Sequence, residues 1–208
     1  MIRAALFDLG GVILTSPFEA FARYEAEHGL PEGFIRELNA TNPDTNAWAQ
    51  LERNQITLDD FCERFEAEAA AAGHPIDARA VVGLLAGEVR PQMLEAVRRC
   101  SERLLTGLLT NNVVSLDGQV DREDAIGAVL DLFDVVIESS RVGLRKPDPE
   151  FYELACSRLG IEPHEAVFLD DLGINLKPAR ALGMTTIKVV DPAQAIAQLE
   201  AVVGFPLR

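Results

Sequence analysis

The sequence has little positive charge. Its 208 residues carry 19 Lys and Arg against 33 Asp and Glu, which gives a formal net charge of −14 at pH 7. Nucleic acids and anionic membranes are bound through basic surface, so this balance argues against both as partners. An acidic chain that handles an anionic ligand therefore needs a local source of positive charge.

Cysteine and long apolar runs are also scarce. The chain has 3 Cys, widely spaced, which argues against a disulfide framework and favours a reducing compartment. Neither a signal-peptide pattern nor an apolar run long enough to cross a membrane is visible, so we expect a cytoplasmic protein. The apolar fraction of 48% is typical of a folded chain with a sizeable core.

Short apolar runs alternate with helical patterns along most of the chain. Pro91 and Pro149 each suit the first position of a helix, and Gly183 suits the end of one. Strands that alternate with helices predict a parallel sheet covered on both faces, hence an α/β fold. The expected strands are residues 3–7, 104–109, 135–138, 166–169 and 186–190.

Residues 16–89 break this alternation and carry helical signals only. Ser16 and Thr57 each begin a capping pattern, and Asn54 suits a left-handed position at a helix end. We therefore expect an all-helical insert, residues 16–89, in a core domain made of residues 1–15 and 90–208. A helical insert at this place is a candidate lid.

Four polar segments stand at strand ends or in the loops just after them. The carboxyl ends of parallel strands share one edge of a sheet, so neighbouring strands would bring these segments together. Each segment alone is a weak signal, but all four in this order are far more specific. The segments are Asp8-Leu9-Gly10-Gly11, Thr110-Asn111-Asn112, Arg145-Lys146-Pro147 and Asp170-Asp171.

The three carboxylates of these segments would repel one another and raise one another's pKa. A divalent cation removes that penalty, and carboxylates, a backbone carbonyl and water are the ligands that Mg²⁺ prefers. The hydroxyl of Thr110, the glycine-flanked N–H groups and Lys146 are donors that suit a phosphate. The sequence thus predicts a local site for a cation and a phosphate.

These segments, on an α/β frame, resemble the haloacid dehalogenase superfamily of hydrolases over essentially the whole chain. Residues 168–180 are most similar to the phosphatase domain at the N-terminus of soluble epoxide hydrolases, and residues 51–57 resemble the helical cap of the same group. The resemblance implies a Rossmann-like parallel sheet with strand order 3-2-1-4-5 and an inserted helical cap.

The resemblance also implies a phosphatase that acts on a small phosphorylated molecule. Asp8 would attack phosphorus and form an aspartyl-phosphate, Thr110 and Asn111 would bind the phosphoryl oxygens, and Lys146 would neutralise their charge. Asn175 would support the last acidic loop. The Mg²⁺ ligands would be Asp8, the main-chain carbonyl of Gly10 and Asp171, and Asp170 would contribute to the metal site through water or by contacts that support the ligands.

One position departs from the family pattern. Phosphatases of this family usually carry a second Asp two residues after the nucleophile as general acid and base, and this chain has Gly10 there. Such help is typically worth about 10²–10⁴ in rate. Three interpretations stay open: turnover biased toward good leaving groups such as acyl or anomeric phosphates, a proton delivered from the cap or a water, or a weakened module that only binds phosphate.

Two further activities use overlapping residues. A 2-haloacid dehalogenase would use Asp8 on carbon without a metal, so Asp170 and Asp171 argue against it. A phospho-acceptor switch similar to a receiver domain also combines acids, Thr and Lys, but its acidic pair comes near the N-terminus and it is much shorter. We expect a monomer or homodimer with no nucleic-acid or membrane partner.

Overall fold

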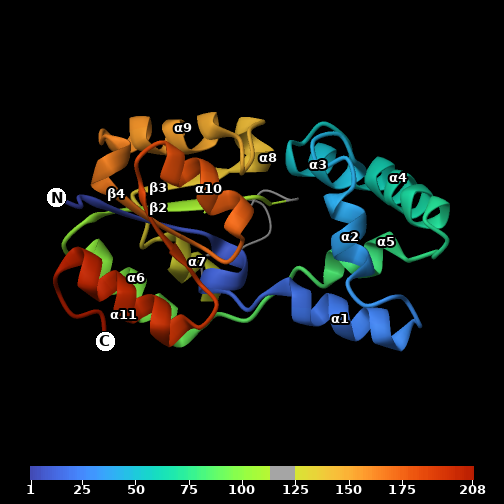
Figure 1. The fold of residues 1–208 in the computed structure, drawn as a ribbon, viewed down its shortest axis with the longest axis horizontal. Coiled ribbons are helices and arrows are strands. Elements are labelled where there is room, and N and C mark those ends of the chain that lie inside the picture. Colours follow the sequence, from blue (N-terminus) through green and yellow to red (C-terminus); the bar gives the residue numbers. More distant parts are fainter. Residues whose placement is uncertain (113–124) are drawn as a thin grey trace.

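The computed structural model describes residues 1–112 and 125–208. Five parallel strands form one sheet with the order β3-β2-β1-β4-β5, which confirms the predicted α/β class and strand order (Figure 1). Each strand lies within two residues of its predicted range. The strands are β1 (Ala4–Phe7), β2 (Leu105–Thr110), β3 (Val135–Glu138), β4 (Ala166–Asp170) and β5 (Thr185–Lys188).

Helices cover both faces of the sheet. In β1, Ala5 and Phe7 belong to one hydrophobic cluster, and Ala4 and Leu6 belong to the other. The first cluster lies beneath α6 (Pro91–Ser101), α7 (Ala125–Leu130) and α11 (Pro192–Val203), and the second lies beneath α9 (Pro149–Leu159) and α10 (Gly173–Ala181) (Figure 1). Because both faces are buried, the strands read as continuous apolar runs in the sequence.

Five consecutive helices between β1 and α6 form a separate hydrophobic cluster, called here the helical part. At its centre the Trp48 ring meets Phe61 and Phe65, each with ring centroids 5.5 Å apart. Ser16 and Thr57 cap helices as predicted, and Asn54 has φ 56°. The helices are α1 (Pro17–Glu27), α2 (Phe34–Ala40), α3 (Ala47–Glu52), α4 (Leu58–Ala71) and α5 (Ala78–Gly83).

The helical part lies beyond the edge at which the strands end (Figure 1). The chain enters and leaves it through two segments that pair with each other: Leu14 forms an antiparallel bridge with Val89, and the Thr15 N–H donates to the Glu88 carbonyl at 2.9 Å. Gly87 lies so close to this pair that a Cβ there would be 2.9 Å from the Thr15 carbonyl oxygen. This paired connection holds the helical part opposite the polar strand ends.

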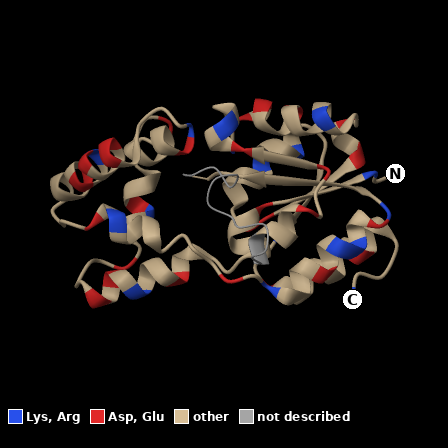
Figure 2. Ribbon diagram, turned by 180° about the vertical axis from the view of Figure 1, so that it is seen from behind, with Lys and Arg blue, Asp and Glu red and all other residues tan. Residues whose placement is uncertain are grey.

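Acidic residues are distributed over both parts of the molecule (Figure 2). Most of the formal charge of −14 therefore belongs to solvated helix surface. Among the described helices, none combines the length and apolar character that a membrane span requires. Asp8, Glu52 and Asp170 are exceptions to the surface pattern, since each is at most 8% exposed.

Candidate active site

Asp8 stands directly after the central strand. Its N–H donates to the Leu169 carbonyl at 2.9 Å, so pairing with β4 continues to this residue, and its Oδ1 accepts from the Leu9 N–H at 2.7 Å. The chain then turns away through η1 (Leu9–Ile13), a wide turn in which Gly10 and Gly11 have non-helical backbone angles. Asp8 is thus fixed at the carboxyl edge of the sheet, where an α/β fold places ligands.

Lys146 lies between two carboxylates. Its Nζ is 2.8 Å from Asp8 Oδ1 and 2.8 Å from Asp170 Oδ2, and its side chain is 1% exposed. The residue comes from the loop before α9, where its peptide bond to Pro147 is cis. A buried ammonium requires paired counter-charges of this kind. Lys146 is therefore the local positive charge that the acidic composition calls for.

Asp170 is fully buried and surrounded by donors. Besides Lys146, it accepts from the Leu172 N–H at 2.8 Å and from Asn175 Nδ2 at 3.1 and 3.0 Å. The Asn175 carbonyl in turn accepts from the buried Tyr152 hydroxyl at 2.7 Å. Both Asp170 oxygens are thus engaged by protein donors, and this carboxylate fixes the place of the Lys146 ammonium.

Asp171 completes a cluster of acids. Ligand oxygens of Asp8, Asp170 and Asp171 all lie within 4.8 Å of one another, which makes them a candidate metal site among the described residues. Gly11 makes room for Asp171, since a Cβ at Gly11 would overlap the Asp171 carboxylate, and the φ of +74° at Gly11 also favours glycine. We call Asp8, Lys146, Asp170 and Asp171 the carboxylate cluster.

The electrostatics of the carboxylate cluster call for a further cation. Burial raises the pKa of Asp8, which Lys146 opposes and Asp170 reinforces. Burial and then Asp170 raise the pKa of Asp171 to about 6. Desolvation would lower the pKa of Lys146, but Asp170 and Asp8 outweigh it and the net shift is upward. One ammonium faces three carboxylates, so a divalent cation with oxygen ligands such as Mg²⁺ fits both the donor set and the charge.

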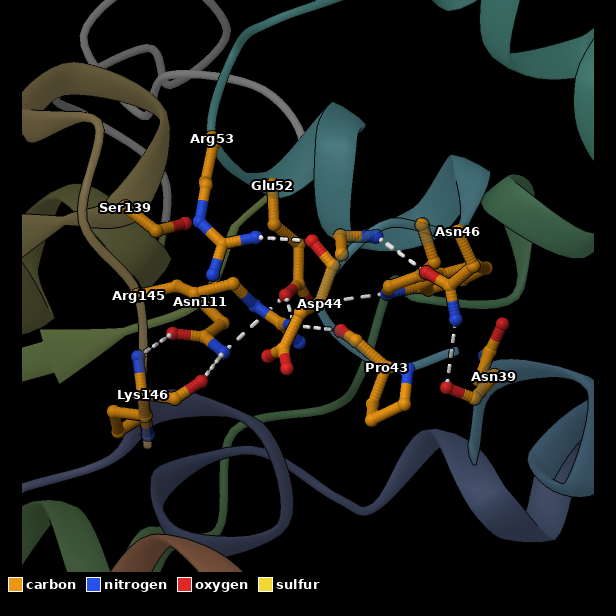
Figure 3. Close-up of polar contacts among 12 residues, drawn as sticks. Asn39, Pro43, Asp44, Asn46, Glu52, Arg53, Asn111, Ser139, Arg145 and Lys146 are labelled. Carbon is orange, nitrogen blue, oxygen red and sulfur yellow. Dashed lines mark hydrogen bonds and ion pairs between the residues drawn. The ribbon is translucent and has the colours of Figure 1, made fainter. Parts of the chain in front are cut away.

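The residues after β2 meet the Lys146 loop. Thr110 is the last residue of β2 and is 4% exposed. The Asn111 side-chain amide joins the two loops: its Oδ1 accepts from the Lys146 N–H and its Nδ2 donates to the Lys146 carbonyl, both at 2.9 Å (Figure 3). The side chain of Asn111 thus orients the segment that carries Lys146. Residues 113–124, which follow on, lie outside the described residues.

Charged residues from the helical part reach the same loops. Glu52, at the end of α3, lies 2.6 Å from Arg145 Nη2 and accepts from Asn111 Nδ2 at 3.3 Å (Figure 3). Arg53 Nη2 lies 3.3 Å from Asp148 Oδ2. Burial raises the pKa of Glu52, and Arg145 opposes that shift. We call Glu52, Arg53, Arg145 and Asp148 the interface cluster, because it joins the helical part to the loops of the sheet.

The sequence does not predict that the four residues of the interface cluster meet. Arg145 belongs to a strand-end segment, whereas Glu52 and Arg53 belong to the segment that resembles the cap, and charges at a helix end ordinarily indicate a solvated surface. One signal was present: Glu52 follows Ala47, Trp48 and Leu51, so a short apolar helix ends in an acid. A charge in apolar surroundings is a candidate for a buried ion pair.

Comparison with known proteins agrees with the family that the sequence motifs resemble. Residues 2–183 match the family model described as haloacid dehalogenase-like hydrolase. The chain belongs to this family. The resemblance inferred from the four strand-end segments is thereby confirmed.

Named relatives of this haloacid dehalogenase-like chain include phosphatases. It is 35% identical over 221 residues to bifunctional epoxide hydrolase 2 of Sus scrofa, an alignment that covers 99% of this chain and 40% of that protein. It is 28% identical over 204 residues to the sesquiterpene phosphatase astK of Aspergillus oryzae, with 97% of each chain covered. The chain thus spans well under two thirds of the epoxide hydrolase and nearly all of the phosphatase.

A solved haloacid dehalogenase family enzyme has the same fold. The enzyme bt-2542 of Bacteroides thetaiotaomicron, in complex with magnesium and inorganic phosphate, aligns with a TM-score of 0.59 and 22% identity over 90% of this chain and 94% of that one. Structural relatives in this family are therefore solved with Mg²⁺ bound, and the present chain carries an acidic triad that could hold such an ion.

Proposed function

We propose that the protein is a Mg²⁺-dependent phosphatase that hydrolyses a small organic phosphate through an aspartyl-phosphate. The observation that carries this proposal is Lys146 Nζ at 2.8 Å from both Asp8 and Asp170, beside a third carboxylate. An ammonium against the Asp8 carboxylate stabilises the charge of a phosphoryl group bound there. Membership in a family of hydrolases, with a phosphatase among the relatives, supports the same activity.

Asp8 acts as the nucleophile. One of its carboxylate oxygens attacks phosphorus in line with the bond to the leaving oxygen, that P–O bond breaks, and its electron pair stays on the leaving group. Water then attacks the phosphorus of the aspartyl-phosphate, which releases inorganic phosphate and regenerates Asp8. Thr110, the main-chain N–H of Asn111 and Lys146 bind the phosphoryl oxygens, since the Asn111 side-chain amide is engaged with the Lys146 loop.

The metal would be held by Asp8, Asp171 and the main-chain carbonyl of Gly10. When bound, Mg²⁺ neutralises charge on the phosphoryl oxygens and offsets the repulsion among the acids. Asp170 contributes by holding Lys146 and the metal-side loop, and Asn175 keeps Asp170 in place.

The helical part serves as a cap over the site. We assign residues 16–89 to a cap domain and residues 1–15 and 90–208 to the core domain. The separate hydrophobic cluster of α1–α5 supports this division. The contact of Glu52 with Arg145 and Asn111 supports a cap that closes onto the phosphate-binding loops. Closure of this kind excludes water from a site and completes it.

The proposal is tested by release of phosphate from p-nitrophenyl phosphate with Mg²⁺, with EDTA, and in Asp8→Asn. We expect activity that requires Mg²⁺ and falls by at least about 10³-fold in the variant, because the nucleophile is lost. Chloroacetate without added Mg²⁺ serves as the matched test of dehalogenation. Halide release from chloroacetate together with no Mg²⁺-dependent phosphate release would replace the phosphatase by a dehalogenase.

A further inference from the structure

The position two residues beyond Asp8 holds no side chain. Gly10 has φ −69° and ψ 134°, values open to any residue. A Cβ built on Gly10 has no neighbour within 4 Å among the described residues. The glycine is therefore required neither by its backbone nor by close packing, unlike Gly11. The consequence is chemical: residue 10 has no side chain that could give a proton to a leaving group.

The described groups that contact Asp8 are committed to other partners. Lys146 directs two of its three N–H groups to Asp8 and Asp170, and the third is the one proposed to bind a phosphoryl oxygen. Asp170 accepts hydrogen bonds on both oxygens, from Lys146, Leu172 and Asn175. A protonated Asp170 would have to give up several of these bonds. Neither residue is arranged to protonate a departing oxygen.

Glu52 is the acid that the cap brings to these loops, and it is also placed as an acceptor. Its Oε1 accepts from Trp48 Nε1 at 3.0 Å, and its Oε2 faces Arg145 and Asn111 (Figure 3). A proton on Glu52 would break the 2.6 Å ion pair with Arg145. The geometry thus makes Glu52 a residue that positions the loops.

With no proton donor for the leaving oxygen among residues 1–112 and 125–208, that oxygen departs as an anion. The cost of this step follows the acidity of the leaving group, with a conjugate-acid pKa of about 4 for a carboxylate and about 10 for a phenolate. An alkoxide is less favourable still, because water and simple alcohols are far weaker acids than a phenol. The P–O bond then breaks readily only where the leaving group is stable as an anion.

We infer that the substrates are phosphates with acidic leaving groups, acyl phosphates foremost, and not phosphate esters of simple alcohols. This inference rests on the proposed phosphatase function and specifies its substrate class. In the first step Asp8 takes the phosphoryl group from the acyl oxygen and a free carboxylate leaves. In the second step water hydrolyses the aspartyl-phosphate and its proton goes to solvent.

The test uses para-substituted phenyl phosphates of similar size, with acetyl phosphate and glycerol 3-phosphate as the two extremes. The quantity to compare is kcat/KM, because it covers the steps up to departure of the leaving group. For the wild type we expect kcat/KM to fall by about 10²-fold or more from p-nitrophenyl to phenyl phosphate, the scale of a missing general acid. A dependence on leaving-group acidity of less than about threefold across the series would overturn the inference.

Two variants sharpen this test. Gly10→Asp adds a carboxyl where space is open, and we expect it to raise kcat/KM for phenyl phosphate by about 10-fold or more and to flatten the series, as an added general acid does. Gly10→Asn adds the same bulk without an acid and is not expected to flatten it. If Gly10→Asp fails to fold, as judged by its melting curve, the wild-type series decides alone.

The variant Glu52→Gln tests whether Glu52 gives a proton to the leaving group or only positions the loops. If Glu52 positions the loops, the variant lowers kcat/KM by a similar factor for every substrate, and the slope stays unchanged. A loss confined to poor leaving groups would identify Glu52 as the acid and overturn the inference. Failure of the proposed function looks different, since no substrate would then show Mg²⁺-dependent release above the Asp8→Asn background.

Discussion

Two clusters of buried charge lie side by side in this molecule, and they differ in balance. The interface cluster contains two cations and two acids, paired as Arg145 with Glu52 and Arg53 with Asp148. The carboxylate cluster contains one cation and three acids. A balanced cluster satisfies itself, whereas an excess of negative charge in a buried place is tolerated only if a cation joins it. The imbalance therefore fits the proposed metal site, and the balanced cluster fits a contact that joins the helical part to the loops of the sheet.

Among the tests of this difference between the two clusters, the largest effect is expected from Lys146→Met. The change leaves Asp170 buried without its counter-charge and removes the ammonium from Asp8. We expect the free energy of unfolding to fall by about 3–5 kcal/mol, the usual effect of breaking a buried pair. We also expect kcat/KM to fall by at least about 10²-fold, as when a transition-state donor is lost. Urea denaturation and steady-state kinetics measure the two effects.

The control for Lys146→Met is Arg145→Met, which removes a cation from the balanced cluster. Its stability loss should be smaller, because the Arg145 and Glu52 side chains are 14% and 9% exposed whereas those of Lys146 and Asp170 are 1% and 0% exposed. If Lys146→Met and Arg145→Met lower the free energy of unfolding equally, the difference in charge balance between the two clusters has no effect on stability.

The second test, Asp171→Asn, should act in the opposite direction on stability. It removes one of three crowded carboxylates, so the metal-free protein should gain stability near pH 7.5. The same change removes a proposed metal ligand and should abolish the stabilisation by Mg²⁺, which for the wild type reaches about 2.7 kcal/mol at a hundred times the dissociation constant. Thermal melting with and without MgCl₂ shows both effects. A variant that melts lower than the wild type without metal would contradict the repulsion argument.

Sequence and topology together account for the carboxylate cluster. Asp8, Thr110 and the Asp170-Asp171 pair each stand at the end of a strand or directly after it, so placing the strands in the order 3-2-1-4-5 is enough to bring them to one edge. Asp170 and Asp171 are neighbours in the sequence, and the sequence alone does not predict that their surroundings differ. The different surroundings follow from Asn175 and Leu172, which donate to Asp170, and from the space that Gly11 leaves for Asp171.

The interface cluster could not be predicted from the sequence. Its pairs join residues 93 or more positions apart, and they depend on how five helices pack and on where the two connecting segments hold them. Hydrophobic periodicity predicts that a helix has a buried face, but it does not say which loop that helix meets. For the same reason, the sequence does not predict that the Asn111 side chain joins the Lys146 loop.

The third test is the pH dependence of the metal-free protein. The pKa of Asp171 is raised from 3.8 to about 6, so between these values the folded state holds a proton that the unfolded chain has released. The stability from this group is therefore fully present below about pH 4 and is lost as pH rises through about 6. The upward shift in the pKa of Asp8 acts in the same direction.

It follows that Mg²⁺, which must displace that proton, should stabilise the protein more at pH 7.5 than at pH 5. Melting curves at both values, with and without MgCl₂, measure the difference. Asp171→Asn provides the control, since its metal-free stability should vary less over the same range. A Mg²⁺ effect that is larger at pH 5 would show that the acids do not bind the ion as carboxylates.

The smallest effect is expected from a double-mutant cycle on Glu52→Gln and Arg145→Met. Because the pair is internally balanced and only partly shielded, with side chains 9% and 14% exposed, its coupling should be about 1–2 kcal/mol, between a surface pair and a fully buried one. The cycle on Arg53→Met and Asp148→Asn should give less, since Asp148 is 29% exposed and the distance is 3.3 Å. Mg²⁺ stabilisation should be almost the same in all four variants, because none of them changes the excess of carboxylates around Asp8. If the Mg²⁺ effect falls together with the Glu52–Arg145 coupling, the interface cluster and the proposed metal site form one electrostatic unit, and cap closure then contributes directly to metal binding.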